Sequence, residues 1–201
     1  MIGNDIIDIR YTKRHHNFQR KGYLQKIYTD EEQELIKTSE YRLYTAWRLW
    51  SMKESAYKSY IKKGHNRFFN PIKLSCSIED NQIGYVKIGH SEYKIQTKRT
   101  ENYIFSHTVV DPLQKLSHKL IRLEESDSNC QSRTIYNSIN YYISQHIKSK
   151  DEFIEIIKDD NGVPSIYVNN LKQDIDLSIT HHGMYGAYSI SDYNFRDRNF
   201  W

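Results

Sequence analysis

The chain has 201 residues, of which 38% are hydrophobic, and its formal net charge at pH 7 is +4. This length suffices for one substantial core or for two small lobes packed together. The two cysteines, Cys76 and Cys130, match no metal-binding spacing and indicate reduced thiols rather than a disulfide framework. Because the sequence shows neither a secretion signal nor a stretch near the ~18 apolar residues of a membrane span, we expect a soluble, cytoplasmic protein without a membrane partner.

The mildly basic charge and the 17 tyrosines could suit nucleic acid, but the sequence contains no compact basic run and no RNA-binding or zinc-finger motif. We therefore expect no nucleic-acid partner. A mildly basic surface equally suits an acidic protein or a phosphorylated cofactor.

The first part of the chain predicts one strand, two helices and a meander. The opening segment IGNDIIDI is apolar with embedded acids and predicts a strand. Thr29, followed three residues later by Glu32, is typical of a capping box, and a long helix from about Tyr41 to Lys63 ends at Gly64. Four strand-like runs separated by Asn, Gly and Ser turns then predict an antiparallel meander. These runs are residues 72–78, 83–89, 93–99 and 102–110.

The polar region from 111 to 130 is the best candidate for a boundary between two lobes. Beyond it, residues 133–147 have helical periodicity, and four strands follow, the last two of them flanking a His-His-Gly corner. The pattern predicts an α+β fold with a lobe at 1–110, a connection at 111–130 and a second lobe at 131–201. No structure is predicted for the aromatic tail.

Glu54 lies on the apolar stripe of the long helix, where a carboxylate must be paired, hydrogen-bonded or metal-bound. One interpretation is an ordinary surface pair with Lys58, worth about 0.2–0.5 kcal/mol. The other brings in Asp5 and Asp8 from the opening strand. Three converging carboxylates repel one another unless a cation joins them, and their hard oxygens suit Mg²⁺ bound together with a phosphate.

His181 lies in SITHHG, directly after an apolar strand and two residues before a glycine. A structural or surface histidine is one interpretation. Zinc is disfavoured because neighbouring histidines on a strand do not point at one metal and no further ligand is suitably spaced. As a third interpretation, His181 donates to a phosphate, and Arg133 on the preceding helix adds a guanidinium fork.

Four motifs together resemble the 4'-phosphopantetheinyl transferase superfamily, with its holo-acyl-carrier-protein synthases and surfactin-synthetase-activating enzymes. They are GNDIID, WSMKES with a lysine four residues after the glutamate, GVP at 162–164, and SITHHG, and the similarity spans nearly the whole chain. The resemblance implies two similar lobes that form a pseudo-dimer, each an antiparallel sheet packed on a long helix.

The resemblance also implies an activity: transfer of the 4'-phosphopantetheine group of coenzyme A to a serine of an acidic apo acyl, polyketide or peptidyl carrier protein. Mg²⁺ would be required, and adenosine 3',5'-bisphosphate would be released. Asp5 and Glu54 match the metal ligands of the family. Asp8 matches a third acid of the small synthases, whereas larger enzymes have theirs where this chain has Ile7, so the third ligand is Asp8 or water.

Lys58 matches the family's lysine after the glutamate, which can stabilise the leaving bisphosphate, and Glu54 or a metal-bound water is the expected base. His181 and Arg133 match positions that contact coenzyme A phosphates. Val163 stands where many relatives carry a lysine or arginine. The alternative is a non-catalytic module of the same fold that binds coenzyme A or a carrier protein, although the retained acids argue against it.

The order of the motifs is reversed relative to large members of the superfamily. Residues 1–110 resemble their second lobe and residues from about 125 to 190 their first, which indicates a circular permutation. A permuted chain would form its site within one molecule and act as a monomer. The alternative is an enlarged trimeric synthase with its site between subunits.

Overall fold

The computed structural model describes residues 1–16, 20–68, 70–111, 115–124, 127–146 and 153–192. The predicted α+β fold is confirmed, because a few helices pack on antiparallel sheets. The unassigned tail lies outside the described residues from position 193 onwards. No helix in the described part of the chain is long and apolar enough to cross a membrane.

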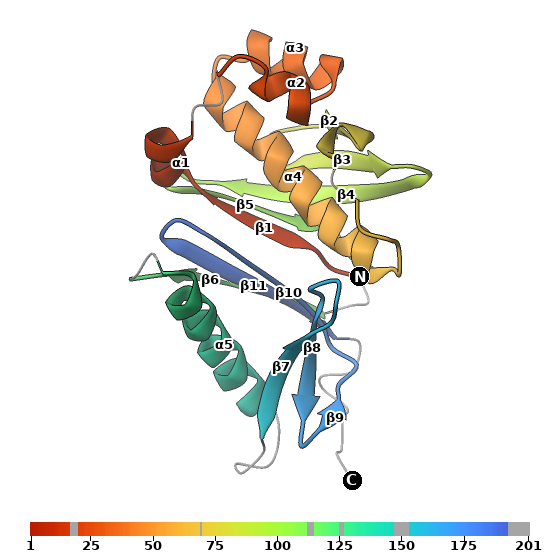
Figure 1. The fold of residues 1–201 in the computed structure, drawn as a ribbon, viewed down its shortest axis with the longest axis vertical. Helices are drawn as coiled ribbons and strands as arrows, with labels where there is room; N and C mark the ends of the chain where they lie inside the picture. The colour runs from red at the N-terminus through yellow and green to blue at the C-terminus, as the bar shows by residue number, and fades with distance from the viewer. Residues whose placement is uncertain (17–19, 69, 112–114, 125–126, 147–152, 193–201) are drawn as a thin grey trace.

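The first half of the chain folds into one five-stranded antiparallel sheet with the strand order β1-β5-β4-β3-β2. The long helix α4 lies across one face of this sheet, and the short helices α1, α2 and α3 surround its N-terminal end (Figure 1). The bounds are β1 Asn4–Asp8, α1 Ile9–His15, α2 Tyr23–Ile27, α3 Asp30–Thr38, α4 Arg42–Lys62, the 3-10 turn Pro71–Lys73, β2 Leu74–Ile78, β3 Ile83–Ile88, β4 Ser91–Arg99 and β5 Tyr103–Thr108.

The local signals in this half predicted α3, α4 and the strands, but not the short helices α1 and α2. The capping box is present, since the Thr29 side chain accepts from the Glu32 N–H and the Glu32 carboxylate accepts from the Thr29 N–H. Helix α4 ends just before Gly64, whose φ of 87° favours glycine. The buried side chains of Met52 and Ala56 pack α4 against the sheet.

The second half contains two three-stranded antiparallel sheets with the orders β10-β11-β6 and β7-β8-β9. Helix α5 packs its buried isoleucines, Ile135, Ile139 and Ile143, against strands of both sheets. The bounds are β6 Lys115–Arg122, α5 Ser128–Ser144, β7 Ile154–Lys158, β8 Pro164–Val168, β9 Leu171–Lys172, β10 Asp176–His182 and β11 Tyr185–Asp192. Whether this half is a copy of the first stays a prediction.

The range predicted as a connection, 111–130, contains a strand that the sequence did not indicate. Strand β6 pairs with β11 along its whole length, and α5 begins at Ser128 with Asp127 as its cap. Part of the predicted connection thus belongs to the sheet of β10 and β11, and the division into lobes at 1–110 and 131–201 stays a prediction. The segment KLSHKLIR looked like a linker because an edge strand, exposed over much of its length, needs few apolar residues.

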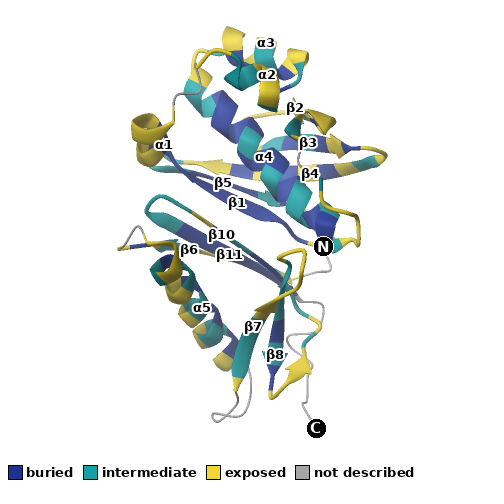
Figure 2. Cartoon of the chain, in the orientation of Figure 1, coloured by how far each residue is buried: buried dark blue, intermediate teal, exposed yellow. Residues whose placement is uncertain are grey.

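The two halves meet where β1 lies beside β10, and both strands are largely buried there (Figure 2). From Ile2, just before β1, to Asp8, every second residue donates its backbone N–H to a side chain of β10. In each case the acceptor residue lies 174 positions later in the sequence. We call this junction of β1 with β10 the seam. Here the backbone N–H groups at the open edge of β1 are hydrogen-bonded by side chains instead of by the backbone of a neighbouring strand. The donor–acceptor pairs are Ile2 with Asp176, Asn4 with Ser178, Ile6 with Thr180, and Asp8 with His182.

Candidate active site

Glu54 lies half-buried on the face of α4 that is directed toward β1. Burial raises the pKa of its carboxyl, and the positive charge of Lys58 opposes this shift. The described residues contain no ion pair between Glu54 and Lys58. Lys58 Nζ instead donates to the carbonyls of Asn4, at 2.8 Å, and Ile179, at 3.3 Å. The structure therefore does not support the surface pair.

Asp5 is buried at the seam between the halves. Its Oδ1 accepts a hydrogen bond from Thr180 Oγ1 at 3.0 Å and lies 3.9 Å from Lys58 Nζ. Burial raises the pKa of Asp5 to about 7, Lys58 opposes the rise, and the charge of Glu54 adds to it. The other oxygen of Asp5, Oδ2, is buried and makes no hydrogen bond of normal geometry with the described residues. The same holds for the nearby hydroxyl of Ser51.

Asp8 lies on the opposite face of β1, because it follows Asp5 by an odd number of residues. Its Oδ1 accepts from the Tyr11 N–H and caps α1, and its Oδ2 accepts from the Met184 N–H, both at 2.9 Å. Gly183 packs so closely that a Cβ there would lie 2.5 Å from Asp8 Oδ2. Asp8 thus joins two structural elements, and the structure does not bring it to Asp5 and Glu54.

The described residues contain no group of three or more His, Cys, Asp or Glu side chains arranged to hold a metal ion. Two carboxylates remain at the centre of the site, Asp5 and Glu54. The orphaned oxygen of Asp5 is the feature that fits a cation, since a buried polar atom needs a partner. Further ligands would have to be water or substrate oxygens, as is usual for Mg²⁺.

A basic pocket of about 210 Å³ opens beside Glu54, between the end of α4, the turn before β8 and strand β10. It brings together the WSMKES helix and the GVP turn, which are more than 100 residues apart in sequence. Four cationic side chains line it, and sequence reasoning identified only Lys58 among them. The others are Lys62, Arg67 and Lys158.

The GVP turn takes its shape from Asp159, whose Oδ1 accepts from the N–H groups of Asn161 and Val163. Gly162 has a φ of 73°, a conformation that side chains with a Cβ rarely adopt. The turn therefore presents backbone and the hydrocarbon of Val163 to the pocket, without a charge of its own.

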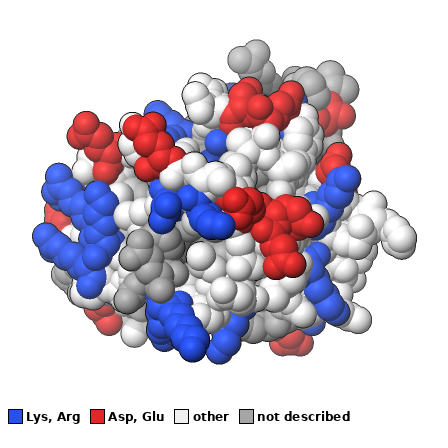
Figure 3. Space-filling model, turned by 90° about the horizontal axis from the view of Figure 1, so that it is seen from above, with Lys and Arg blue, Asp and Glu red and all other residues white. Residues whose placement is uncertain are grey.

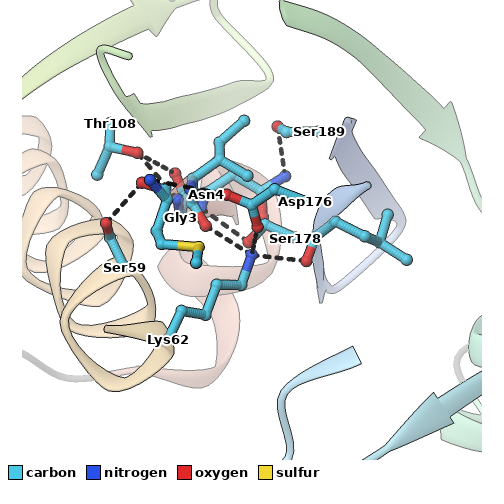
Figure 4. Close-up of polar contacts among 11 residues, drawn as sticks. Gly3, Asn4, Ser59, Lys62, Thr108, Asp176, Ser178 and Ser189 are labelled. Carbon is cyan, nitrogen blue, oxygen red and sulfur yellow. Dashed lines mark hydrogen bonds and ion pairs between the residues drawn. The ribbon is translucent and has the colours of Figure 1, made fainter. Parts of the chain in front are cut away.

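Lys62 also lines the basic pocket, but its charge is engaged by the seam (Figure 4). Its Nζ donates to Asp176 Oδ1 at 2.6 Å and to the carbonyls of Ile2 and Leu177 at 2.7 and 2.6 Å. Burial lowers the pKa of Lys62, and Asp176 opposes this shift. Lys62 thus ties the end of α4 to the starts of β1 and β10.

His181 and Arg133, the predicted phosphate contacts, lie in different places. Partial desolvation and the charges of Lys158 and Lys58 lower the pKa of His181, so its ring lies in the field of the basic pocket. Arg133 is exposed on α5, where it donates to Cys130 Sγ at 3.3 Å. Arg133 lines neither the basic pocket nor the aromatic pocket described next, so the structure does not place it at the site.

An aromatic pocket of about 440 Å³ lies on the other side of Glu54, toward the N-terminal end of α4. His182 packs there against the rings of Tyr11, His16 and Trp47, with centroids 5.1 to 6.4 Å apart. Among the described residues that line this pocket there is no lysine, arginine, aspartate or glutamate. The lining residues are Ile7, Tyr11, His16, Tyr23, Trp47, Trp50, Gln131, His181, His182 and Gly183.

The site combines a cationic pocket with two carboxylates, those of Asp5 and Glu54. A site of this kind suits a phosphorylated ligand, and this defines the class of protein. Comparison with known proteins specifies the family. The model of the 4'-phosphopantetheinyl transferase superfamily matches residues 1–111, more than half of the chain, and the chain belongs to this superfamily. No curated protein matches the chain. Membership supports a transferase of phosphopantetheine groups with coenzyme A and a carrier protein as partners.

Proposed function

We propose that this protein transfers the 4'-phosphopantetheine group of coenzyme A to a serine of an apo acyl, polyketide or peptidyl carrier protein. Adenosine 3',5'-bisphosphate is the second product. The observation that carries the proposal is the convergence of Asp5, Glu54 and Lys58 beside a basic pocket, in a chain of this superfamily. Residues of both halves of the chain, such as Glu54 and Lys158, line the same pocket, and this supports a monomer as the proposed active form.

Asp5 Oδ2 and the Glu54 carboxylate are the proposed ligands of a Mg²⁺ ion. Thr180 holds the other oxygen of Asp5, which leaves Oδ2 free for the cation. When bound, Mg²⁺ supplies charge neutralisation on the pyrophosphate oxygens.

In the proposed reaction the serine Oγ forms a bond to the phosphorus that carries pantetheine, and the bond from this phosphorus to the bridging oxygen breaks. Glu54 accepts the serine proton, and burial raises the pKa of its carboxyl, which favours this role. Lys58, fixed by two backbone carbonyls, stabilises the charge that develops on the departing bisphosphate.

The two pockets determine the orientation in which coenzyme A binds. The nucleotide end is anionic and suits the basic pocket, whereas the pantetheine arm is uncharged and suits the aromatic pocket. The pyrophosphate between them then lies at Asp5 and Glu54.

An acidic carrier protein would dock beside the aromatic pocket. Helix α1 contributes Tyr11 and carries the exposed cations Arg10, Lys13 and Arg14. Figure 3 shows basic side chains gathered on the side of the molecule where α1 lies. Such a patch steers an acidic partner toward the site.

The proposal is tested by incubating the protein with coenzyme A, Mg²⁺ and a panel of apo carrier proteins, followed by intact-mass measurement of each carrier. We expect one carrier to gain the mass of one phosphopantetheine arm. Binding of coenzyme A without a mass gain on any carrier would instead favour the non-catalytic module.

A further inference from the structure

A third pocket, of about 1050 Å³, is larger than the two that flank Glu54, and none of its lining residues belongs to either of them. It lies beside the N-terminal end of α4 and extends past the end of β4 to β5 and β6, so we call it the junction pocket. Small-molecule sites usually enclose roughly 300–1,000 Å³, and the junction pocket is therefore large enough for a whole ligand. It is lined by residues of the segments 39–48, 81–82, 96–99, 105–107 and 118–120.

Arg48 lines the junction pocket as a buried cation, with only 4% of its surface exposed. Its Nη2 donates to the carbonyls of Asp80 and Ile83 at 2.8 and 3.1 Å, while its Nε is buried without a hydrogen-bond partner among the described residues. The carboxylate of Asp80 accepts from N–H groups of its own turn, and no described carboxylate lies within ion-pair distance of Arg48. Because a buried charge without an opposite charge is unfavourable, an anion in the adjoining pocket would stabilise Arg48.

Two more cations, Lys98 and Arg99, line the same pocket from the end of β4, and both are exposed. The guanidinium of Arg99 lies over the rings of Tyr44 and Tyr41, at 4.1 and 4.9 Å from their centroids. Burial raises the pKa of Tyr44, and the charges of Arg48 and Arg99 both oppose this shift, so the two guanidinium groups lie near each other around this ring. Among the described residues that line the pocket there is no aspartate or glutamate to neutralise the three cations.

The side of the junction pocket formed by β5 and β6 is neutral. Phe105 and Leu120 belong to one apolar cluster on this side. Burial lowers the pKa values of His107 and His118, so both rings are uncharged at neutral pH. The junction pocket thus places a cationic side opposite an apolar one.

We infer that the junction pocket is a second binding site, which takes a small amphiphilic anion. The carboxylate or phosphate group of this ligand accepts charge-assisted hydrogen bonds from Arg48, Lys98 and Arg99. Its apolar body packs on Phe105 and Leu120. None of these residues takes part in the proposed transfer, so the site is separate from the one proposed for coenzyme A. The bound anion supplies the opposite charge that Arg48 lacks and thereby stabilises the folded chain.

Calorimetry with octanoate and octyl phosphate tests the site, with acetate and inorganic phosphate as matching head groups that lack the apolar body. We expect each protein molecule to bind one alkyl anion, at least about tenfold more tightly than the matching head group, because the alkyl chain buries several CH₂ groups. Binding of either alkyl anion supports the site, and the tighter of the two identifies the head group.

Variants place the bound anion in the junction pocket. Since both side chains are exposed, Lys98→Gln and Arg99→Gln should fold normally, and each should weaken the alkyl anion about tenfold. Lys94→Gln, on the same strand but outside the pocket, should leave the affinity unchanged, as should Lys58→Met in the basic pocket. The anion should also raise the melting temperature of the wild type, but not that of the double variant Lys98→Gln/Arg99→Gln.

Absence of saturable binding by both alkyl anions would overturn the site. So would a loss of affinity in Lys94→Gln or Lys58→Met as large as the loss in Arg99→Gln, since the anion would then respond to net charge alone or bind in the basic pocket. Arg48→Met leaves two carbonyls without their donor and can prevent folding, so the two exposed variants decide the test.

Discussion

The two pockets that flank Glu54 share one helix but differ in charge. Toward the C-terminal end of α4 the pocket is lined by four cations, and toward the N-terminal end it is lined by aromatic rings and histidines without lysine, arginine or acid. A ligand with one charged and one neutral end can therefore bind in one direction only. This asymmetry, centred on Glu54, accounts for how a site could select coenzyme A and present its pyrophosphate to two carboxylates.

Glu54 lies between the two pockets, and the variant Glu54→Gln keeps the shape of its side chain but removes the charge. We expect turnover to fall about a thousandfold, within the range for loss of a general base, while thermal stability is unchanged or rises because a buried carboxyl is removed. Steady-state transfer and a melting curve measure the two quantities. Near-normal turnover would contradict the role of Glu54.

The basic side is tested by comparing two lysines of α4, Lys58 and Lys53. Lys58→Met should lower turnover about a hundredfold and coenzyme A affinity much less, because its charge acts on the departing bisphosphate. Lys53 lies instead in a buried ion pair with Glu32, at 2.6 Å. Lys53→Met should destabilise the fold by about 3–5 kcal/mol, as measured by denaturant unfolding.

If Lys53 were the catalytic lysine and Lys58 the structural one, the two variants would show the opposite effects. A large turnover defect in Lys53→Met at full stability, with a mild one in Lys58→Met, is the result that would show it.

The aromatic side is tested by Trp50→Leu. We expect coenzyme A affinity to fall about tenfold, since the arm loses a large ring, and affinity for adenosine 3',5'-bisphosphate to stay unchanged. Calorimetry with both ligands gives the comparison. If the bisphosphate lost as much affinity as coenzyme A, the direction proposed for the cofactor would be reversed or absent.

A smaller effect is expected between β5 and β6, where the rings of His107 and His118 lie 4.1 Å apart. Burial and, to a smaller extent, the neighbouring His107 together lower the pKa of His118 from 6.5 to about 3. The unfolded chain therefore takes up a proton below pH 6.5 that the folded chain refuses until about pH 3, so stability falls as the pH is lowered through this range.

Denaturant unfolding at several pH values should show this loss in the wild type and a shallower one in His118→Gln. Identical pH profiles for the two proteins would place the acid sensitivity elsewhere.

Local signals in the sequence predicted α4 and the capping box, because periodicity and turn chemistry act over a few residues. The role of Asp8 was missed because its partner, the Met184 N–H, is supplied by distant backbone. Arg67 and Lys158 carry no local signal, since an exposed cation looks alike whether it faces solvent or a pocket.

The proposed permutation has one structural correlate. Asp176 accepts from the Ile2 N–H and pairs with Ser191 across β10 and β11, so the start of β1 lies beside the end of β11. A permuted chain requires this neighbourhood. The permutation itself stays a prediction.

The central claim is that Asp5 and Glu54 together hold Mg²⁺ against the pyrophosphate of coenzyme A. Calorimetric titration of Mg²⁺ into the complex with coenzyme A tests it most directly, with the wild type, Asp5→Asn and Glu54→Gln compared at one pH. We expect saturable binding in the wild type, and an affinity at least about tenfold weaker in each variant, since each loses one charged ligand. Equal Mg²⁺ affinity in all three proteins would contradict the claim.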